Sequence, residues 1–335
     1  MRNLLIAAGL TVCISVPAAA GTLGTIFTSY YAFGDSLTDD GKFGLLPPPS
    51  AGGRFTNGPT YAEMIAEDFA TSDNYALGGA TAGPENDNAP YGTATTDPTF
   101  DLNQFATLSD QVDVFESDLD LSAAGSRPLV SVLMGSNDIF QQTYLDAGRT
   151  VLNPAYDVED TVDHVIAAVE RIAGLGPFGD FIIPLTPGAG DGTFGATRVE
   201  YNEYLFEQVA GLRASGLNIY VPNLDAASAR IAADPTAYGI TETGPCASTG
   251  IGSFDPTNCT FAGFDGSGDP IFDLDLANAY SLADPVHPTT PVHREWANEV
   301  EATVLRAVAP VPLPASGLLL VAGLGALAVR KRAAA

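Results

Sequence analysis

The sequence YYAFGDSLTD at residues 30–39 places an apolar run directly before a Gly-Asp-Ser-Leu tetrapeptide. A short apolar run that ends at a turn residue is typical of a strand in the core of a parallel sheet. Gly34 permits a sharp turn, after which Ser36 can project from the sheet edge. Since binding and reactive groups gather beyond the carboxyl ends of strands in α/β folds, Ser36 is a candidate nucleophile.

Between residues 29 and 309, short apolar runs alternate with longer amphipathic segments, which predicts βα units and a parallel sheet. The expected fold is a single three-layer α/β/α domain over residues 21–310, with a five-stranded parallel sheet. The predicted strands are Tyr30–Phe33, Asn74–Leu77, Leu129–Met134, Phe181–Leu185 and Asn218–Val221; the predicted helices are Tyr61–Phe69, Leu102–Leu119, Val158–Leu175, Arg198–Ala214 and Val292–Ala309. Two stretches without periodicity, Pro84–Thr99 and Gly239–Pro270, are expected to be long loops that form walls of a binding site.

Further polar motifs follow the later strands of this series. The pair Gly78-Gly79 comes after the second strand, Asn137 after the third, and Asp284 stands three residues before His287, ahead of the last helix. Each motif alone is typical of a turn, as is the Asp-Ser pair at residues 35–36. Together at successive strand ends they indicate a catalytic site.

With these motifs, and with GRFTNGP at residues 53–59, the chain resembles the SGNH/GDSL hydrolases, in particular the lipase and esterase branch that includes phospholipase-like enzymes. The resemblance covers roughly Tyr31–Val300. It implies that Ser36 is the nucleophile, that His287 is the general base and that Asp284 orients this base. It also implies an oxyanion hole.

The oxyanion hole implied by the resemblance consists of Ser36 N–H, Gly79 N–H and the side-chain amide of Asn137. Gly78 remains an alternative to Gly79. A serine hydroxyl needs a base to accept its proton, the base needs a partner that fixes its tautomer, and the developing oxyanion needs fixed donors. This chemistry requires no metal and no organic cofactor.

Several other polar residues have structural interpretations that compete with functional ones. Bracing of loops is expected for Asp35 and Asp138, and is at least as plausible as substrate contact for Arg54 and Asn57. His164 and His293 are expected at the surface or at a helix cap. The acidic residues at 265–275 could hold Ca²⁺, but their spacing does not match an EF-hand loop.

Cys246 and Cys259 lie thirteen residues apart in a Gly/Ser/Thr/Asn-rich stretch. In an oxidising compartment two such cysteines are expected to pair, and a loop of this size would stabilise the fold by roughly 3 kcal/mol. Two cysteines cannot supply the four ligands of a structural zinc site.

The formal net charge of −26 comes from 40 acidic and 14 basic side chains. Such a polyanion is repelled by phosphate backbones and by anionic lipid headgroups, which argues against nucleic-acid binding. The apolar fraction of 46% is large enough to form a core, so wholesale disorder is excluded as well.

Both ends of the chain have the composition of targeting segments. Residues 1–20 run from Arg2 through an apolar stretch to three alanines, which predicts a secretory signal peptide cleaved after Ala20; an N-terminal membrane anchor is the alternative. Residues 311–335 contain VPLPA, an apolar stretch and the basic cluster at 330–332, and resemble a bacterial C-terminal sorting signal read by a membrane sorting protease. A permanent membrane anchor is the alternative for this tail.

The sequence thus predicts an exported esterase or lipase at the cell envelope or surface, or secreted. Lipid esters, lysophospholipids and acetylated polysaccharides all remain open as substrates. The rival hypothesis is a surface or matrix binding protein that keeps the hydrolase scaffold but has little turnover, and the sorting-like tail motivates it.

Overall fold

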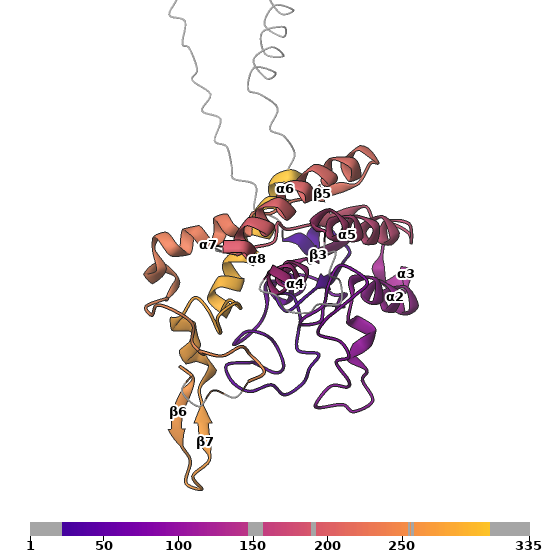
Figure 1. Ribbon diagram of the computed structural model, residues 1–335. Coiled ribbons are helices and arrows are strands. Elements are labelled where there is room, and N and C mark those ends of the chain that lie inside the picture. The colour runs from indigo at the N-terminus through magenta and orange to yellow at the C-terminus, as the bar shows by residue number, and fades with distance from the viewer. Residues whose placement is uncertain (1–21, 147–156, 189–191, 254, 256–257, 309–335) are drawn as a thin grey trace, which may run out of the picture.

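The computed structural model describes residues 22–146, 157–188, 192–253, 255 and 258–308. Its centre is a five-stranded sheet in the order β2-β1-β3-β4-β5, with every neighbouring pair parallel. Helices surround this sheet (Figure 1). The strands are β1 (Ser29–Gly34), β2 (Ser72–Asn74), β3 (Pro128–Leu133), β4 (Asp180–Ile182) and β5 (Asn218–Tyr220). The predicted α/β fold with a five-stranded parallel sheet is confirmed.

The two central strands, β1 and β3, are buried along their whole length. Because successive side chains of a strand point to opposite faces, each strand contributes to two separate cores. Tyr31 and Phe33 belong to one core cluster and Tyr30 and Ala32 to the other. The sheet is therefore covered on both faces, which gives the three layers.

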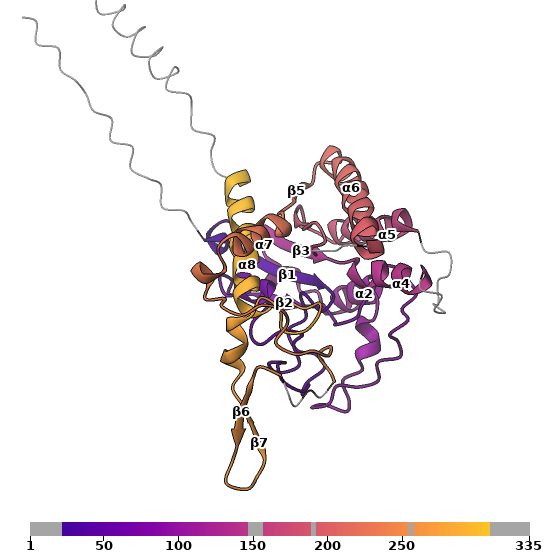
Figure 2. The same cartoon turned by 60° about the vertical axis from the view of Figure 1, so that its left-hand side comes forward.

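The helices divide between these two cores, and Figure 2 shows α7 and α8 on one side of the central strands and α2, α5 and α6 on the other. Residues of α1 pack in the same core as those of α7 and α8. The helices are α1 (Tyr61–Ala66), α2 (Leu108–Asp118), α3 (Leu121–Ala124), α4 (Ser136–Asp146), α5 (Val158–Ala173), α6 (Gly192–Ala214), α7 (Leu224–Ala233) and α8 (Thr290–Val308), with short 3₁₀ turns η1 (Leu23–Thr25), η2 (Leu102–Phe105), η3 (Pro235–Tyr238) and η4 (Leu274–Ala279).

Several predicted elements differ from the structure in their extent, and the differences are largest in the second strand, in the helix at residues 102–119 and at the start of α6, which begins at Gly192 instead of Arg198. The second strand was expected to begin at Asn74, but β2 ends there; Tyr75 N–H and Leu77 N–H nevertheless donate to Ala32 O and Gly34 O, so the ladder continues without regular strand geometry. The helix expected at residues 102–119 is divided into η2 and α2. Thr107 divides them because its side chain caps α2 by accepting from the N–H of Asp110.

The predicted loop at residues 239–270 is wrong in part, because it contains strand β6 (Phe261–Phe264), which pairs with β7 (Pro270–Phe272) as an antiparallel hairpin. This hairpin projects from the body of the domain in both views (Figures 1 and 2). The stretch Pro84–Thr99 has no helix or strand, as expected. The expected signal peptide and sorting tail lie outside the described residues, and within the described ranges no helix is long and apolar enough to cross a membrane.

Candidate active site

Ser36 lies in the turn that follows β1, at the carboxyl edge of the sheet. The turn is fixed by Asp35, whose main-chain carbonyl accepts from the N–H groups of Thr38 and Asp39. His287 approaches from the segment before α8, and its Nε2 is 2.8 Å from Ser36 Oγ. The structure therefore brings together two predicted residues that are 251 positions apart in the sequence.

Asp284 completes the hydrogen-bonded chain, since its Oδ2 is 2.7 Å from His287 Nδ1. The carboxylate is fully buried and also accepts the main-chain N–H groups of Val286 and His287 at Oδ1, and that of Ile251 at Oδ2. Burial acts to raise the pKa of Asp284, but the hydrogen bonds from His287 and these N–H groups outweigh it and the pKa is lowered. Asp284 is therefore held as an ionised acceptor against the imidazole.

The predicted disulfide between Cys246 and Cys259 is present and closes a loop that contains Ile251. Cys246 N–H donates to Leu282 O, and Ile251 N–H donates to Asp284 Oδ2 at 2.7 Å. The cross-linked loop is thus attached to the segment that carries the acid. The contribution of Ile251 is not predictable from the sequence, because a main-chain donor leaves no signature in residue type.

The two glycines after β2 form a tight turn in which Ala80 N–H donates to Leu77 O and Gly79 has a φ of +81°. Gly78 N–H donates to Asp39 Oδ2 at 2.7 Å and is therefore occupied. Among the described residues, neither Gly79 N–H nor Ser36 N–H donates a hydrogen bond. Because Gly78 N–H is occupied, Gly79 N–H is the better placed of the two candidate donors.

Asn137, the third predicted donor, lies in the first turn of α4. One proton of its side-chain amide is used, because Nδ2 donates to Ala80 O at 2.9 Å. The amide carries a second proton, which has no acceptor among the described residues and can be donated to a ligand. This contact also fixes the amide against the same turn that contains Gly79.

Aromatic side chains line the surroundings of this site. The Phe55 ring lies 5.1 Å from the His287 ring, and Phe43 contacts both Phe55 and Tyr91 edge to face. Tyr91 belongs to the stretch 84–99, and Phe55 to the Gly-rich stretch after the Ser36 turn. These rings form an apolar surface beside the serine and its base.

The remaining polar candidates have mainly structural contacts. Arg54 forms an ion pair with Glu63, with an N–O distance of 2.6 Å, and Asn57 accepts from Thr290 N–H, so both side chains brace the loop. His164 is exposed. The expectation of a surface position for His293 is wrong, because the side chain is buried and desolvation lowers its pKa to about 3. It has a capping contact instead, since its Nδ1 accepts from the N–H of Tyr61, the first residue of α1.

The acidic cluster at residues 265–275 has local contacts in the hairpin. Asp265 Oδ1 accepts the N–H groups of Ser267 and Asp269, which closes the hairpin turn, and Asp273 accepts from Asp275 N–H. Among the described residues, no group of three or more His, Cys, Asp or Glu side chains is arranged to hold a metal ion.

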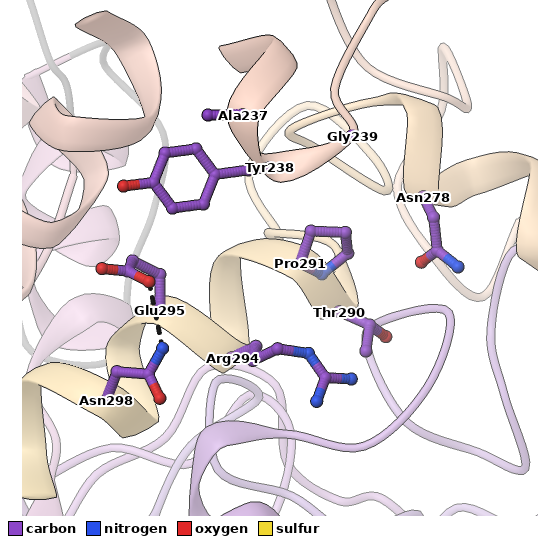
Figure 3. A pocket seen from close by; sticks show the side chains of 9 residues that line it. All are labelled: Ala237, Tyr238, Gly239, Asn278, Thr290, Pro291, Arg294, Glu295 and Asn298. Atoms are coloured by element: carbon purple, nitrogen blue, oxygen red, sulfur yellow. Dashed lines mark hydrogen bonds between the residues drawn. The ribbon is translucent and has the colours of Figure 1, made fainter. Parts of the chain in front are cut away.

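A separate surface hollow of about 530 Å³ lies beside the first turns of α8, where Arg294 and Tyr238 face it (Figure 3). Its lining residues are Ala237, Tyr238, Gly239, Asn278, Thr290, Pro291, Arg294, Glu295 and Asn298. Ser36, Asp284 and His287 are not among them. The hollow is therefore distinct from the candidate active site.

Asp35 is the buried carboxyl group nearest in sequence to Ser36, and its Oδ1 accepts Leu37 N–H. Burial raises its pKa from 3.8 to about 7. A raised carboxyl pKa means that the folded state binds the proton more tightly, so folding stability falls as pH rises from about 4 to about 7. We expect Asp35→Asn, which keeps the acceptor for Leu37, to reduce this pH dependence.

The effect of Asp35→Asn is measured by urea unfolding of both proteins between pH 5 and pH 8. The difference in slope should approach about 1.4 kcal/mol per pH unit where one proton is taken up on folding. Identical pH slopes for the two proteins would show that Asp35 is ionised in the fold at pH 5.

The five-stranded parallel sheet and the Ser–His–Asp chain at its carboxyl edge define an α/β protein of the SGNH-hydrolase type. The chain belongs to the GDSL-like Lipase/Acylhydrolase family, whose model matches residues 30–300. The predicted SGNH/GDSL family is thereby confirmed, and so is the prediction that the protein is a carboxylic-ester hydrolase.

Individual relatives are more distant. A 147-residue region is 33% identical to phosphatidylcholine-sterol acyltransferase from Aeromonas hydrophila and covers 41% of this chain, but only 38% of that enzyme. A lipolytic G-D-S-L family protein from Veillonella parvula is 15% identical over 81% of this chain and 95% of its own, with a TM-score of 0.42. The acetylxylan esterase Axe2 from Geobacillus stearothermophilus is 14% identical over 85% of this chain and 95% of its own, with a TM-score of 0.41.

Proposed function

We propose that the protein is an exported serine esterase that cleaves carboxylic esters through an acyl-enzyme on Ser36. One observation carries the proposal: His287 contacts Ser36 Oγ through Nε2 at 2.8 Å and Asp284 through Nδ1 at 2.7 Å. Both distances are within the range of a base that accepts a hydroxyl proton while a carboxylate fixes its tautomer.

The reaction follows from these contacts. Ser36 Oγ attacks the ester carbonyl carbon while its proton passes to His287 Nε2, and Asp284 stabilises the imidazolium through Nδ1–H. The tetrahedral intermediate then expels the alcohol, whose oxygen takes the proton from Nε2. Water attacks the resulting acyl-enzyme with His287 again as the base, which releases the acid and restores Ser36.

The negative oxygen of both tetrahedral intermediates needs donors that are already in place. In this proposal it is bound by Ser36 N–H, Gly79 N–H and the second amide proton of Asn137. The two main-chain groups have no acceptor among the described residues, so their donation to a substrate replaces no protein hydrogen bond. No metal or organic cofactor takes part in the proposed steps.

Uncharged acyl esters are the proposed substrates. The aromatic surface formed by Phe43, Phe55 and Tyr91 favours contact with an acyl chain or with another apolar part of the substrate. The net charge of −26 opposes approach to anionic lipid surfaces. Acetylated polysaccharides and phosphatidylcholine are the substrates named for the acetylxylan esterase and the acyltransferase similar to this chain, and both are uncharged overall.

Export belongs to the same proposal. The order of charged, apolar and small residues at 1–20 supports a signal peptide, and the motif with its apolar stretch and basic end at 311–335 supports recognition by a membrane sorting protease. The disulfide between Cys246 and Cys259 agrees with an oxidising compartment outside the cytoplasm.

The proposal is tested by labelling the folded protein with a fluorophosphonate probe and locating the label by peptide mass spectrometry. We expect one label, on Ser36, because only this hydroxyl contacts a histidine base among the described residues. The rate of chromogenic ester turnover should fall in proportion to the fraction of protein that is labelled. Absence of label on Ser36 would favour the rival hypothesis of a binding protein on a hydrolase scaffold.

A further inference from the structure

The turn formed by Leu77, Gly78, Gly79 and Ala80 has hydrogen bonds to three other segments of the chain. Its conformation requires glycine, since the φ of Gly79 is +81° and a Cβ there would lie 2.7 Å from the Tyr91 hydroxyl oxygen. Within the turn, Ala80 N–H donates to Leu77 O, and the other hydrogen bonds of Gly78, Gly79 and Ala80 go to side chains outside it. The direction of Gly79 N–H is therefore set by the groups that surround the turn.

Asp39 holds the turn on one side. Its carboxylate is fully buried, and Oδ2 accepts Gly78 N–H at 2.7 Å, while Oδ1 accepts the N–H groups of Gly41 and Lys42 at 2.8 and 3.0 Å. Asp39 is only three residues after Ser36. This one side chain thus joins the serine turn to the glycine turn.

Two asparagines of the 84–99 stretch hold the turn on the other side. The side-chain amides of Asn86 and Asn88 donate to the carbonyl oxygen of Gly79 at 3.1 and 3.0 Å. Asn86 is buried and also donates to Ala106 O, whereas Asn88 is exposed. These contacts fix the Leu77–Gly78 and Gly79–Ala80 peptide groups, which flank the peptide group that carries Gly79 N–H. Gly79 N–H itself donates no hydrogen bond among the described residues.

We propose that Asp39, Asn86 and Asn88 are positioning residues that hold the Gly78–Gly79 turn so that Gly79 N–H meets the developing oxyanion. The inference rests on the proposed esterase function. Ala80 extends the same arrangement, since its carbonyl accepts from Asn137 and so aligns the side-chain donor with the main-chain donor. Preorganised donors stabilise a transition state because no free energy is spent on their alignment during the reaction.

The test is Asp39→Asn, with Asp40→Asn as the matched control. The amide of the first variant can still accept from Gly41 and Lys42, but its NH₂ group then faces Gly78 N–H, donor against donor. The control removes a partly exposed carboxylate that pairs with Lys42 and does not contact the turn. Both substitutions remove one negative charge, so the comparison isolates the contact with Gly78.

We expect Asp39→Asn to lower kcat on a short acyl ester by about 10- to 100-fold with little change in KM, because loss of a whole oxyanion donor costs about 10²- to 10³-fold. Inhibition by butylboronic acid, which forms a tetrahedral adduct on a serine, should weaken by a similar factor. A purely structural role would not weaken this inhibitor while KM stays constant. Asp40→Asn should remain within about twofold of the unchanged protein.

Asn88→Ala is the second variant, because an exposed asparagine can be removed without loss of the fold. Loss of one of the two donors to Gly79 O should lower kcat about fivefold. If Asp39→Asn does not fold, the inference is tested with Asn88→Ala alone. An unchanged kcat in Asn88→Ala would overturn it. Ser36→Ala is assayed in parallel to separate the esterase proposal from the positioning role. Turnover in Ser36→Ala contradicts the esterase proposal. An inactive Ser36→Ala together with a fully active Asp39→Asn contradicts the positioning role alone.

Discussion

Ser36→Ala is expected to lower kcat for a chromogenic acyl ester by about 10⁶-fold, the scale found when the nucleophile of a serine hydrolase is removed. The reason is chemical, because the acyl-enzyme bond forms on Ser36 Oγ and alanine has no atom that can form it. Among the described residues, no other hydroxyl contacts His287 Nε2. The measurement is kcat at saturating ester, together with a urea unfolding curve.

The control for this variant is Ser253→Ala, which removes an exposed hydroxyl from the disulfide-closed loop near the site. It should retain full activity. The unfolding midpoint of Ser36→Ala should match that of the unchanged protein, since Ser36 is only partly buried and its hydroxyl makes one hydrogen bond among the described residues. More than about 1% residual turnover in Ser36→Ala would contradict the assignment of the nucleophile.

The sheet could be predicted because its strands depend on local sequence. Strands β1 and β3 are apolar runs that end at glycine or at a polar motif. This pattern is typical of strands that are buried on both faces, so the sequence predicts them directly. The edge strand β2 was displaced in the prediction, since Ser72 and Asp73 are exposed and carry no apolar signal. In this strand, pairing with β1 decides the structure instead of composition.

Helices α4 and α7 were not predicted. For α7 a signal exists, because Asn223 caps the helix by accepting from Ala226 N–H and Leu224, Ala227 and Ile231 form its buried face. The signal is weak because the helix has only ten residues, and only two of its three buried side chains are larger than alanine. For α4 the polar start at Ser136 is typical of a turn as well as of a helix, and packing against the sheet decides between them.

The candidate site was predictable where chemistry constrains residue type, and not where a main-chain group or a fold-dependent contact is used. Ser36 follows a predicted strand, Asp284 and His287 precede the last helix, and the resemblance to the SGNH/GDSL hydrolases implies their roles; the structure brings the three within hydrogen-bond distance. The choice between Gly78 and Gly79 depended on the contact with Asp39, which no local pattern reveals. The donor at Ile251 depends in the same way on a contact between distant segments.

The second large effect is expected for Asp284→Asn, which should lower kcat by about 10⁴-fold with a smaller change in KM. The carboxylate accepts four hydrogen bonds, two at each oxygen, and an amide can accept at only one oxygen. If the amide oxygen faces the N–H groups of Val286 and His287, the NH₂ group opposes Ile251 N–H. The same NH₂ group then donates to His287 Nδ1, which must be the unprotonated ring nitrogen. The base then carries its own proton on Nε2, toward Ser36, and cannot deprotonate the hydroxyl.

The opposite orientation of this amide keeps the favourable contact at Nδ1 but places NH₂ against the N–H groups of Val286 and His287, so either choice costs a buried hydrogen bond. Because the pKa of Asp284 is lowered, acidification to pH 5 leaves the carboxylate of the unchanged protein ionised, and the loss in Asp284→Asn should persist from pH 5 to pH 8. The exposed Asp275, in the same segment, supplies the matched control Asp275→Asn, which should be fully active. A loss below about tenfold in kcat across this range would mean that another group orients His287.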